Sequence, residues 1–372
     1  MASGFSLKDQ LFNAQTVGHL GQLFADADVF AAEPFVADVM ADMGPLELKA
    51  RINFIAEILA IHLPDDFTQA CAAVRKALPP ALDPSKFDDD FGHFIYAPLG
   101  VFVESHGIPD HIDLSLEMLA ELTTRFSMEF SIRAFLNHDQ PSVLAQMQHW
   151  SGNSHYHLRR LVSEGTRPRL PWGQNVGLST TETYPLLDTL YGDPTRFVTR
   201  SVANHLNDIT KFDPDSVVAR LKIWQTAGGQ DAKELAWLSK HALRGLIKSG
   251  HAGALEFLGY RPDVAVKITR FDLSGDTIKR GGELALDIEI TTDQAEPLII
   301  DYVIDFMKSN GKTAPKVSKL KVLTTKANTP TALSKKHHFK DDATTFKLYP
   351  GAHRVHLQVN GQIVASQSFT LT

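Results

Sequence analysis

The spacing of apolar residues changes near residue 261, and this change constrains the fold more than any other feature of the chain. Up to residue 260, apolar residues recur at helical intervals, in segments such as Val17–Leu23 and Leu46–Ile61. Prolines cut this region into short pieces, because proline cannot continue a helix interior. The pattern predicts a mainly α-helical domain over residues 1–260.

After residue 262 the apolar residues alternate with polar ones, as they do in β-strands. The segments ELALDIEIT and HRVHLQVNGQIVASQSF show this alternation, and Asn360-Gly361 in the second segment predicts a tight hairpin. Six to eight strands over residues 262–372 predict a small all-β sandwich of the immunoglobulin-like kind, without a cysteine pair. The basic runs KVSKLKVLTTK and SKKHHFK are either solvated strand faces or phosphate-contacting surfaces.

The helical region contains a repeat of 41 residues. Arg159, Arg200 and His241 are equivalent in this repeat, and Arg133 holds the same position in an earlier partial copy. A period near 40 indicates a HEAT-like or armadillo-like solenoid, in which equivalent positions lie on one face. The repeat predicts a row of cations along a concave surface. The alternative is that these arginines tie adjacent repeats together.

One tract is basic although the chain carries a net charge of −6. Residues 1–110 hold 6 Lys and Arg against 16 Asp and Glu, whereas the tract Trp150–Trp172 holds four arginines and one acid, Glu164. Guanidinium groups suit phosphate oxygens, and the interleaved aromatic rings suit sugars or bases. A local basic face can bind nucleic acid despite a negative net charge.

Metal, nucleotide and nucleophile motifs are missing from the sequence. His155-x-His157 and His337-His338 have no cysteine or carboxylate at ligand spacing, and no phosphate-binding glycine loop or GxSxG turn is present. We expect neither a metal nor another cofactor. Cys71 is the single cysteine and is expected to be buried. Without an apparent secretory or membrane segment, a cytoplasmic protein is expected.

Carboxylates close to the basic tract point to a particular chemistry. Glu121, Glu129, Glu164 and Asp208 are the candidates. Cleavage of an N-glycosidic bond develops positive charge on the sugar, and an anionic oxygen stabilises that charge and orients water. The alternative for each acid is an intramolecular salt bridge.

Three segments carry a family resemblance: SMEFSIRAFL, WSGNSHYHLRRLVSEGTRPRLPWG and SVANHLNDITK. Together with the repeats they resemble the HEAT-like-repeat alkylpurine DNA glycosylases, in the AlkC branch. The likeness covers most of residues 1–260, and the predicted sandwich resembles the immunoglobulin-like domain of some members. The resemblance implies base excision repair of N3-alkylated bases, such as 3-methyladenine and 3-methylcytosine, in double-stranded DNA. It also implies excision without full base flipping, by a monomer with no metal, membrane or obligate protein partner, acting at the nucleoid.

The resemblance also suggests roles for individual residues. Glu121 would be the catalytic carboxylate, with Asp208 as the second candidate and Trp172 as an aromatic wall near the lesion; Glu129 or Glu164 could replace either acid. The predicted DNA contacts are Arg133, Trp150, His155, Arg159, Arg160, Arg167, Arg169, Arg200, Lys240, His241 and Arg244.

Two functions other than an enzyme remain open at this level. A HEAT-repeat scaffold that binds DNA or a protein without catalysis is the principal alternative, because fold alone does not determine function. A protein-interaction adaptor built on the sandwich is the second.

Overall fold

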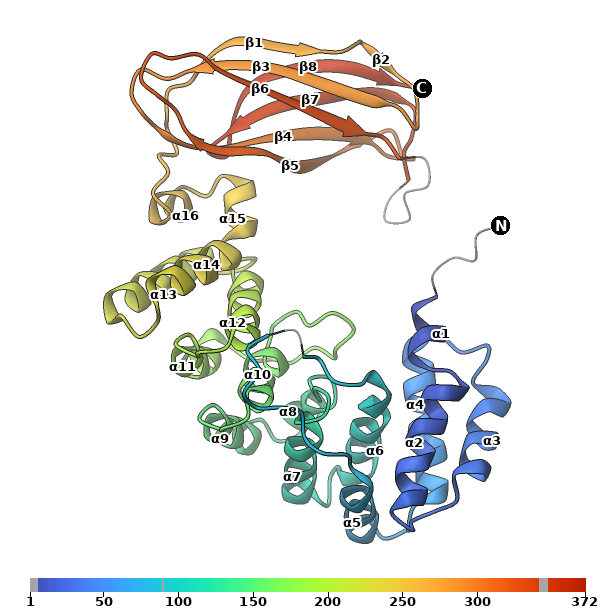
Figure 1. Ribbon diagram of the computed structural model, residues 1–372. Helices are drawn as coiled ribbons and strands as arrows, with labels where there is room; N and C mark the ends of the chain where they lie inside the picture. The colour runs from blue at the N-terminus through green and yellow to red at the C-terminus, as the bar shows by residue number, and fades with distance from the viewer. Residues whose placement is uncertain (1–5, 89, 341–346) are drawn as a thin grey trace. The chain divides into compact units, whose positions relative to one another are not determined.

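The computed structural model describes residues 6–88, 90–340 and 347–372, and it shows helices followed by strands (Figure 1). The predicted order of a helical region and a β-sandwich is thereby confirmed. The first helices are α1 Leu7–Leu11, α2 Ala14–Asp26, α3 Ala32–Asp42, α4 Leu48–His62, α5 Phe67–Ala77, the 3-10 turn η1 Phe94–Tyr96, α6 Ala97–Gly107, α7 Ile112–Thr123 and α8 Ile132–His138. The later helices are α9 Gln140–Trp150, α10 Tyr156–Gly165, α11 Thr180–Leu190, α12 Arg196–Ile209, α13 Pro214–Ala227, α14 Ala232–Ala242, α15 Arg244–Ser249 and α16 Ala252–Phe257.

The chain divides into two compact units. One holds residues 1–211 and 224–242, and the other holds residues 212–223 and 243–372, which include all the strands. The sequence-based division into residues 1–260 and 262–372 stays a prediction. No helix within the described residues combines the length and apolar character needed to cross a membrane.

Local sequence explains where the helices begin. Asn13 precedes α2, and its side-chain oxygen accepts hydrogen bonds from the backbone N–H groups of Gln15 and Thr16 at 2.9 and 3.1 Å. Such a cap satisfies donors that the first helical turn leaves unpaired.

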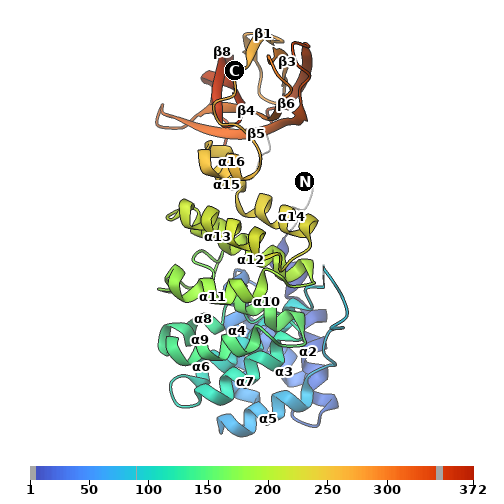
Figure 2. The ribbon, with the colours of Figure 1, turned by 90° about the vertical axis from the view of Figure 1, so that its left-hand side faces the viewer.

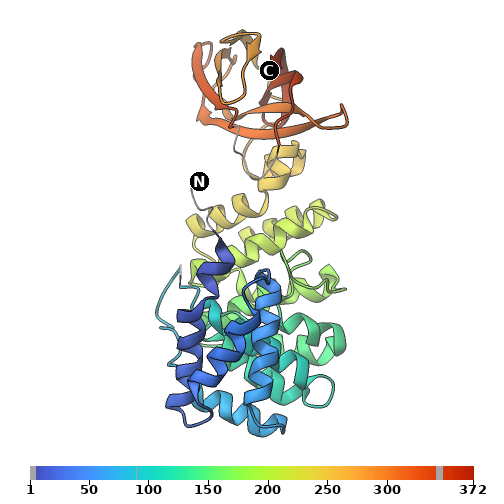
Figure 3. The ribbon, with the colours of Figure 1, turned by 90° about the vertical axis from the view of Figure 1, so that its right-hand side faces the viewer.

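The first helices pack against one another: α3 packs against both α2 and α4, and α4 packs against α6. Figure 3 views the unit from the side of these first helices, drawn in blue.

The later helices of the first unit stack as repeats. Helix α10 packs on α12, and α12 packs on α14, while α9 and α11 also contact α10 and α11 contacts α12. Figure 2 shows α9 and α11 one above the other, on the side facing the viewer. Apolar residues of α12, among them Val202 and Leu206, are fully buried. The same helix also buries Ser201 and His205, which hydrogen-bond to residues of α10, and Asp208, which hydrogen-bonds to Arg167 just beyond the end of α10.

The second unit is a sandwich of two sheets, with strand orders β1-β3-β6 and β2-β8-β7-β4-β5. Inward residues of both sheets, such as Leu286, Ile300 and Leu357, form its apolar core. The predicted hairpin joins β7 to β8 through Asn360 and Gly361, both at positive φ. The strands are β1 Lys267–Leu273, β2 Thr277–Ile278, β3 Glu283–Thr291, β4 Pro297–Met307, β5 Thr313–Thr324, β6 Thr331–His338, β7 Gly351–Val359 and β8 Gln362–Leu371.

The helices α15 and α16 belong to the same compact unit as the sandwich. The side-chain amide of Gln358 donates to the carbonyl of Lys248 at 2.9 Å, and Asn360 donates to the carbonyl of Arg261 at 2.9 Å. Gly250 and Gly361 approach so closely that a Cβ on Gly361 would lie 2.1 Å from the Cα of Gly250. The second unit therefore begins before the first alternating segment of the sequence.

Candidate functional site

The basic tract of the sequence spans the end of α9, helix α10 and the segment that follows α10. Trp150 ends α9 and is buried. His155 caps α10, where it is also buried, and its Nε2 lies 3.1 Å from the carbonyl oxygen of Leu82. The tract then forms α10 and enters the segment 166–179, named here the Trp172 loop, which leads to α11. The tract is therefore part interior and part surface.

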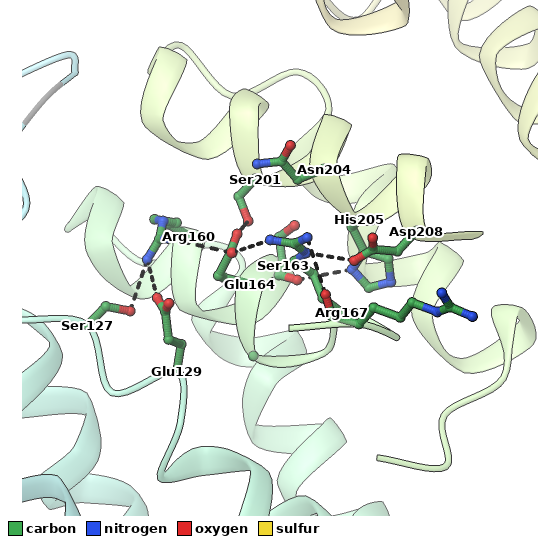
Figure 4. A network of polar contacts seen from close by, with 12 residues as sticks. Ser127, Glu129, Arg160, Ser163, Glu164, Arg167, Ser201, Asn204, His205 and Asp208 are labelled. Atoms are coloured by element: carbon green, nitrogen blue, oxygen red, sulfur yellow. Dashed lines mark hydrogen bonds and ion pairs between the residues drawn. The ribbon is translucent and has the colours of Figure 1, made fainter. Parts of the chain in front are cut away.

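Five charged side chains form a buried network, shown in Figure 4. The arginine–carboxylate network consists of Glu129, Arg160, Glu164, Arg167 and Asp208. At one end, the Nη1 of Arg160 donates to Glu129 Oε2 at 2.5 Å and to the hydroxyl of Ser127 at 3.0 Å. The guanidinium of Arg160 also lies over the ring of Phe197, 4.6 Å from its centroid.

Arg167 joins the other two carboxylates of the network. Its Nη1 donates to Glu164 Oε1 at 2.6 Å, and its Nε donates to Asp208 Oδ2 at 2.9 Å. The second oxygen of Glu164 accepts a hydrogen bond from the hydroxyl of Ser201 at 2.6 Å. Lys211 donates to the other oxygen of Asp208 at 2.9 Å. Charges are thus paired along the whole length of the network, as buried charges require.

Burial and charge act in opposite directions on Glu164. Burial alone would raise the pKa of its carboxyl, since a low-dielectric site disfavours the charged form. The guanidinium groups of Arg160 and Arg167, together with the hydroxyl of Ser201, outweigh burial and leave the pKa of Glu164 below its ordinary value. Glu164 is therefore an anion at neutral pH.

The three acids of the network differ in exposure. The side chain of Glu129 is 15% exposed, compared with 6% for Glu164 and 4% for Asp208. Glu129 lies in the segment between α7 and α8, beside Ser127. Among these acids, Glu129 is the one that a bound molecule reaches most easily.

A pocket of about 500 Å³ adjoins the network. Its wall comes from α4, η1, α6, the segment 126–131 and Trp172, and it is largely apolar, with Phe94 and Phe126 among its rings. Ser127 is shared between this pocket and the partners of Arg160. Trp172 is 64% exposed and lies at the rim. An apolar pocket with a few polar groups beside it is the usual form of a ligand site.

Several arginines of the predicted cationic row are held inside the first unit. Arg133 is fully buried and donates to backbone carbonyls. Arg159 forms a two-pronged ion pair with Asp193, at 2.5 and 3.1 Å. Arg200 pairs with Asp88. The alternative noted in the sequence, that repeat arginines tie adjacent segments together, describes these contacts.

The remaining predicted DNA contacts occupy varied positions. Arg169 and Lys240 are exposed. The Nε2 of His241 lies 3.0 Å from Asn204 Oδ1, and its ring stacks on Trp237. Arg244 belongs to the second compact unit. Of the predicted set, Arg160, Arg167 and Asp208 come together in one cluster.

Glu121 lies in a separate contact. It is near the end of α7, its carboxylate accepts from Arg75 Nε at 2.8 Å, and its side chain is 34% exposed. Arg75, on α5, also reaches Glu117 at 3.2 Å. The cation that pairs with Glu121, Arg75, is not a member of the arginine–carboxylate network.

The sequence did not single out Ser127, Ser201 or His205, which complete the site. Ser201, His205 and Asp208 are spaced four and three residues apart, so they share one face of α12. That spacing is the signal that could have identified them. Within the described residues, no group of three or more His, Cys, Asp or Glu side chains could hold a metal ion.

Known proteins resemble this chain along nearly its whole length. Residues 267–372 match the family model described as the C-terminal Ig-like domain of the uncharacterised protein YhaZ. YhaZ of Bacillus subtilis is 31% identical over 335 residues, which is 89% of this chain and 89% of YhaZ. The solved structure of Pseudomonas fluorescens alkylpurine DNA glycosylase AlkC, bound to DNA containing an abasic site analogue, matches with a TM-score of 0.88 at 33% identity. The match covers 99% of this chain and 100% of the AlkC chain. This chain belongs to the AlkC family.

Membership of the AlkC family confirms the resemblance that the three sequence segments indicated. It also confirms the predicted fold class, a helical-repeat region followed by an immunoglobulin-like sandwich. The AlkC match extends through both compact units, so it includes the network, the pocket and the strands.

Proposed function

We propose that this protein is a DNA glycosylase that hydrolyses the N-glycosidic bond of alkylated bases in double-stranded DNA. The observation that carries the proposal is the full-length similarity to AlkC, an alkylpurine DNA glycosylase whose structure contains DNA with an abasic site analogue. An abasic site is what remains once a glycosylase has removed a base. The substrate class proposed is N3-alkylated bases, 3-methyladenine first and 3-methylcytosine second, excised without full base flipping.

The arginine–carboxylate network supplies the chemistry in this proposal. As the bond between C1′ and the base nitrogen breaks, the base leaves with the electron pair and the sugar gains positive charge. An ionised carboxylate stabilises that charge and orients a water molecule, whose oxygen bonds to C1′ while a carboxylate accepts its proton. A cationic alkylated base is already a good leaving group, so strong acid catalysis is not needed.

We assign to Glu129 the role of the carboxylate that stabilises the positive charge on the sugar. It is the least buried acid of the network, it neighbours Ser127 at the pocket, and Arg160 fixes its position. Glu164 and Asp208 lie deeper and keep the two arginines in place. Glu121, which the family resemblance suggested first, is the rival assignment, and its carboxylate is engaged by Arg75.

Trp172 and the exposed cations are proposed to contact the DNA. The Trp172 ring, at the rim of the pocket, would stack on a base or sugar at the lesion. Arg169 and Lys240, together with the lysines of β5 and β6, would contact phosphates. As an enzyme of chromosomal DNA, the protein is proposed to act as a monomer in the cytoplasm, at the nucleoid.

Product identification tests this proposal. The protein is incubated with DNA that carries 3-methyladenine, 3-methylcytosine and 7-methylguanine, and the released bases are separated and quantified. Release of free 3-methyladenine, with alkali-sensitive sites left in the DNA, is expected. Binding of the same DNA without release of any base would support a non-catalytic scaffold instead.

A further inference from the structure

Arg133 is buried beneath the Trp172 loop and hydrogen-bonds to its backbone. The residue lies on α8 and is 0% exposed. Its Nη1 donates to the carbonyls of Gly165 and Arg167 at 2.7 and 2.9 Å, and its Nε donates to the carbonyl of Gln174 at 2.5 Å. One side chain therefore holds both the beginning of the loop and the residues just after Trp172.

These hydrogen bonds suit a guanidinium and no other side chain. Three carbonyls in different directions require several donors in a fixed planar fork, which arginine supplies and lysine does not. Burial lowers the pKa of Arg133 to about 10, which still leaves the group charged at neutral pH. Hydrogen bonds from a charged donor are stronger than neutral ones, so the loop is held firmly.

The backbone of Trp172 needs such support. Its φ is +65°, in the left-handed region that bulky L-residues avoid. Such a conformation persists only where the surroundings determine it. The carbonyl of Trp172 lies 3.4 Å from Lys49 Nζ, while the N–H of Gly173 donates to the carbonyl of Leu170 at 3.1 Å. The exposed ring therefore projects from a tightly constrained turn.

Gly173 brings this turn directly against Arg133. A Cβ on Gly173 would lie 3.2 Å from both Cδ and Nε of Arg133, and 3.0 Å from Cδ2 of Leu170. These separations are tighter than ordinary contacts, so an added methyl group would displace the turn or the guanidinium. In the same loop, a Cβ on Gly177 would meet nothing within 4 Å.

We propose that Arg133 is a positioning residue, which fixes the Trp172 loop and so holds the indole of Trp172 ready at the rim of the pocket. Arg133 acts on DNA through Trp172 and not by touching phosphate. The inference rests on the proposed function, since it gives Trp172 a part in excision. A ring that is ordered before DNA binds loses little further freedom in the complex, and misplacing it slows the reaction.

The test uses two variants that disturb the contact and one that does not. Gly173→Ala keeps Arg133 but crowds it, Arg133→Lys keeps a charge but not the fork, and Gly177→Ala is the matched control. All are made in a Trp237→Phe background. The remaining tryptophans, Trp150 and Trp224, are 3% and 1% exposed, so quenching of fluorescence by acrylamide reports on Trp172. Thermal unfolding checks that each variant is folded.

Quenching and excision are then measured on the same proteins. We expect Gly173→Ala and Arg133→Lys to change the quenching constant and to slow single-turnover excision by roughly 10- to 100-fold. We expect Gly177→Ala to match the parent in both. Unchanged quenching in both disturbing variants would overturn the proposal, whatever their activity.

Trp172→Ala separates this inference from the proposed function. If this variant excises bases at the parental rate although the disturbing variants alter quenching, the positioning role in excision is overturned and the glycosylase stands. If the parent protein itself releases no base, the proposed function is overturned. The role of Arg133 in excision is then overturned as well. Quenching then still shows whether Arg133 fixes the ring.

Discussion

Arg167 lies three residues after Glu164 and pairs with it, with its Nη1 2.6 Å from Oε1 of the carboxylate. Its Nε reaches Asp208 on the neighbouring helix α12. One guanidinium thus connects the end of α10 to the end of α12. Both carboxylates are nearly inaccessible to water, and Arg167 is the cation that they share, with Arg160 also close to Glu164 and Lys211 also paired with Asp208.

Removing Arg167 should destabilise the first unit strongly. Arg167→Ala leaves two buried carboxylates without their shared partner, and the expected loss is about 3–5 kcal/mol of unfolding free energy. Urea unfolding measures it. Arg169→Ala is the matched control, because Arg169 is exposed in the same loop, and its change should stay within about 0.5 kcal/mol. Equal losses in the two variants would contradict the account of the network.

DNA binding should separate the exposed arginines from the paired ones. Arg169→Ala should weaken binding to a duplex and reduce the slope of log K against log salt by about one, as expected for one phosphate contact. Arg159→Ala breaks the pair with Asp193, so it should lower the free energy of unfolding and leave the salt slope close to the parental value. Titrations at several salt concentrations provide the measurement. A full unit of slope lost in Arg159→Ala alone would assign the phosphate contact to Arg159.

Ser201 should influence the pH at which excision begins to slow on acidification. It does so through the pKa of Glu164, the carboxylate that keeps the two arginines of the network in place. Its hydroxyl helps to hold the pKa of Glu164 below the ordinary value, so Ser201→Ala should raise that pKa. Glu164 would then protonate at a higher pH, and the fall of the excision rate on acidification should begin at a higher pH than in the parent. Rates between pH 4 and 8 give the profile.

Ser163→Ala is the control for that profile. Ser163 is equally buried on α10, and its hydroxyl has no hydrogen-bond partner among the described residues. An acid limb that shifts by the same amount in both variants would mean that packing, and not the bond to Glu164, is responsible.

The architecture could be read from the sequence because it depends on periodicity. The change from helical to alternating spacing near residue 261, and the Asn360-Gly361 hairpin, are local signals, and the structure contains what they predicted. The inclusion of residues 212–223 and of the helices from Leu243 onward in the second compact unit was not visible in this way. It depends on close approaches such as that of Gly250 to Gly361, which no periodicity records.

The site could be predicted only in part. Composition drew attention to the tract Trp150–Trp172, and Arg160, Arg167 and Asp208 do meet in one cluster. The partner of each charge could not be predicted from the sequence, because it depends on which helices pack side by side. Arg133 illustrates the difficulty: its sequence position resembled that of a surface cation, yet three backbone carbonyls enclose it.

Stability should fall on mild acidification because of buried histidines. Burial lowers the pKa of His205 to about 4, whereas a histidine in the unfolded chain titrates near 6.5. Between these values the unfolded chain binds more protons than the folded one, so the free energy of unfolding decreases as the pH falls. His205 alone should contribute about 2 kcal/mol of loss between pH 7 and pH 5.

Urea unfolding at pH 7, 6 and 5 measures this effect. His205→Gln should show a smaller dependence on pH than the parent over this range, although it is less stable at pH 7. His157, with a pKa also lowered to about 4, should account for part of the remaining slope. A parental stability that is flat from pH 7 to pH 5 would contradict the burial of neutral histidines.

The most direct test is single-turnover release of 3-methyladenine from a duplex by the parent protein, Glu129→Gln and Glu121→Gln. We predict that the parent releases the base and that Glu129→Gln slows release by about 100-fold or more, with the greater loss in Glu129→Gln than in Glu121→Gln. Affinity for a duplex with an abasic site analogue should stay close to the parental value. Release at the parental rate by Glu129→Gln would remove that residue from the chemistry, and absence of release by the parent would contradict the glycosylase itself.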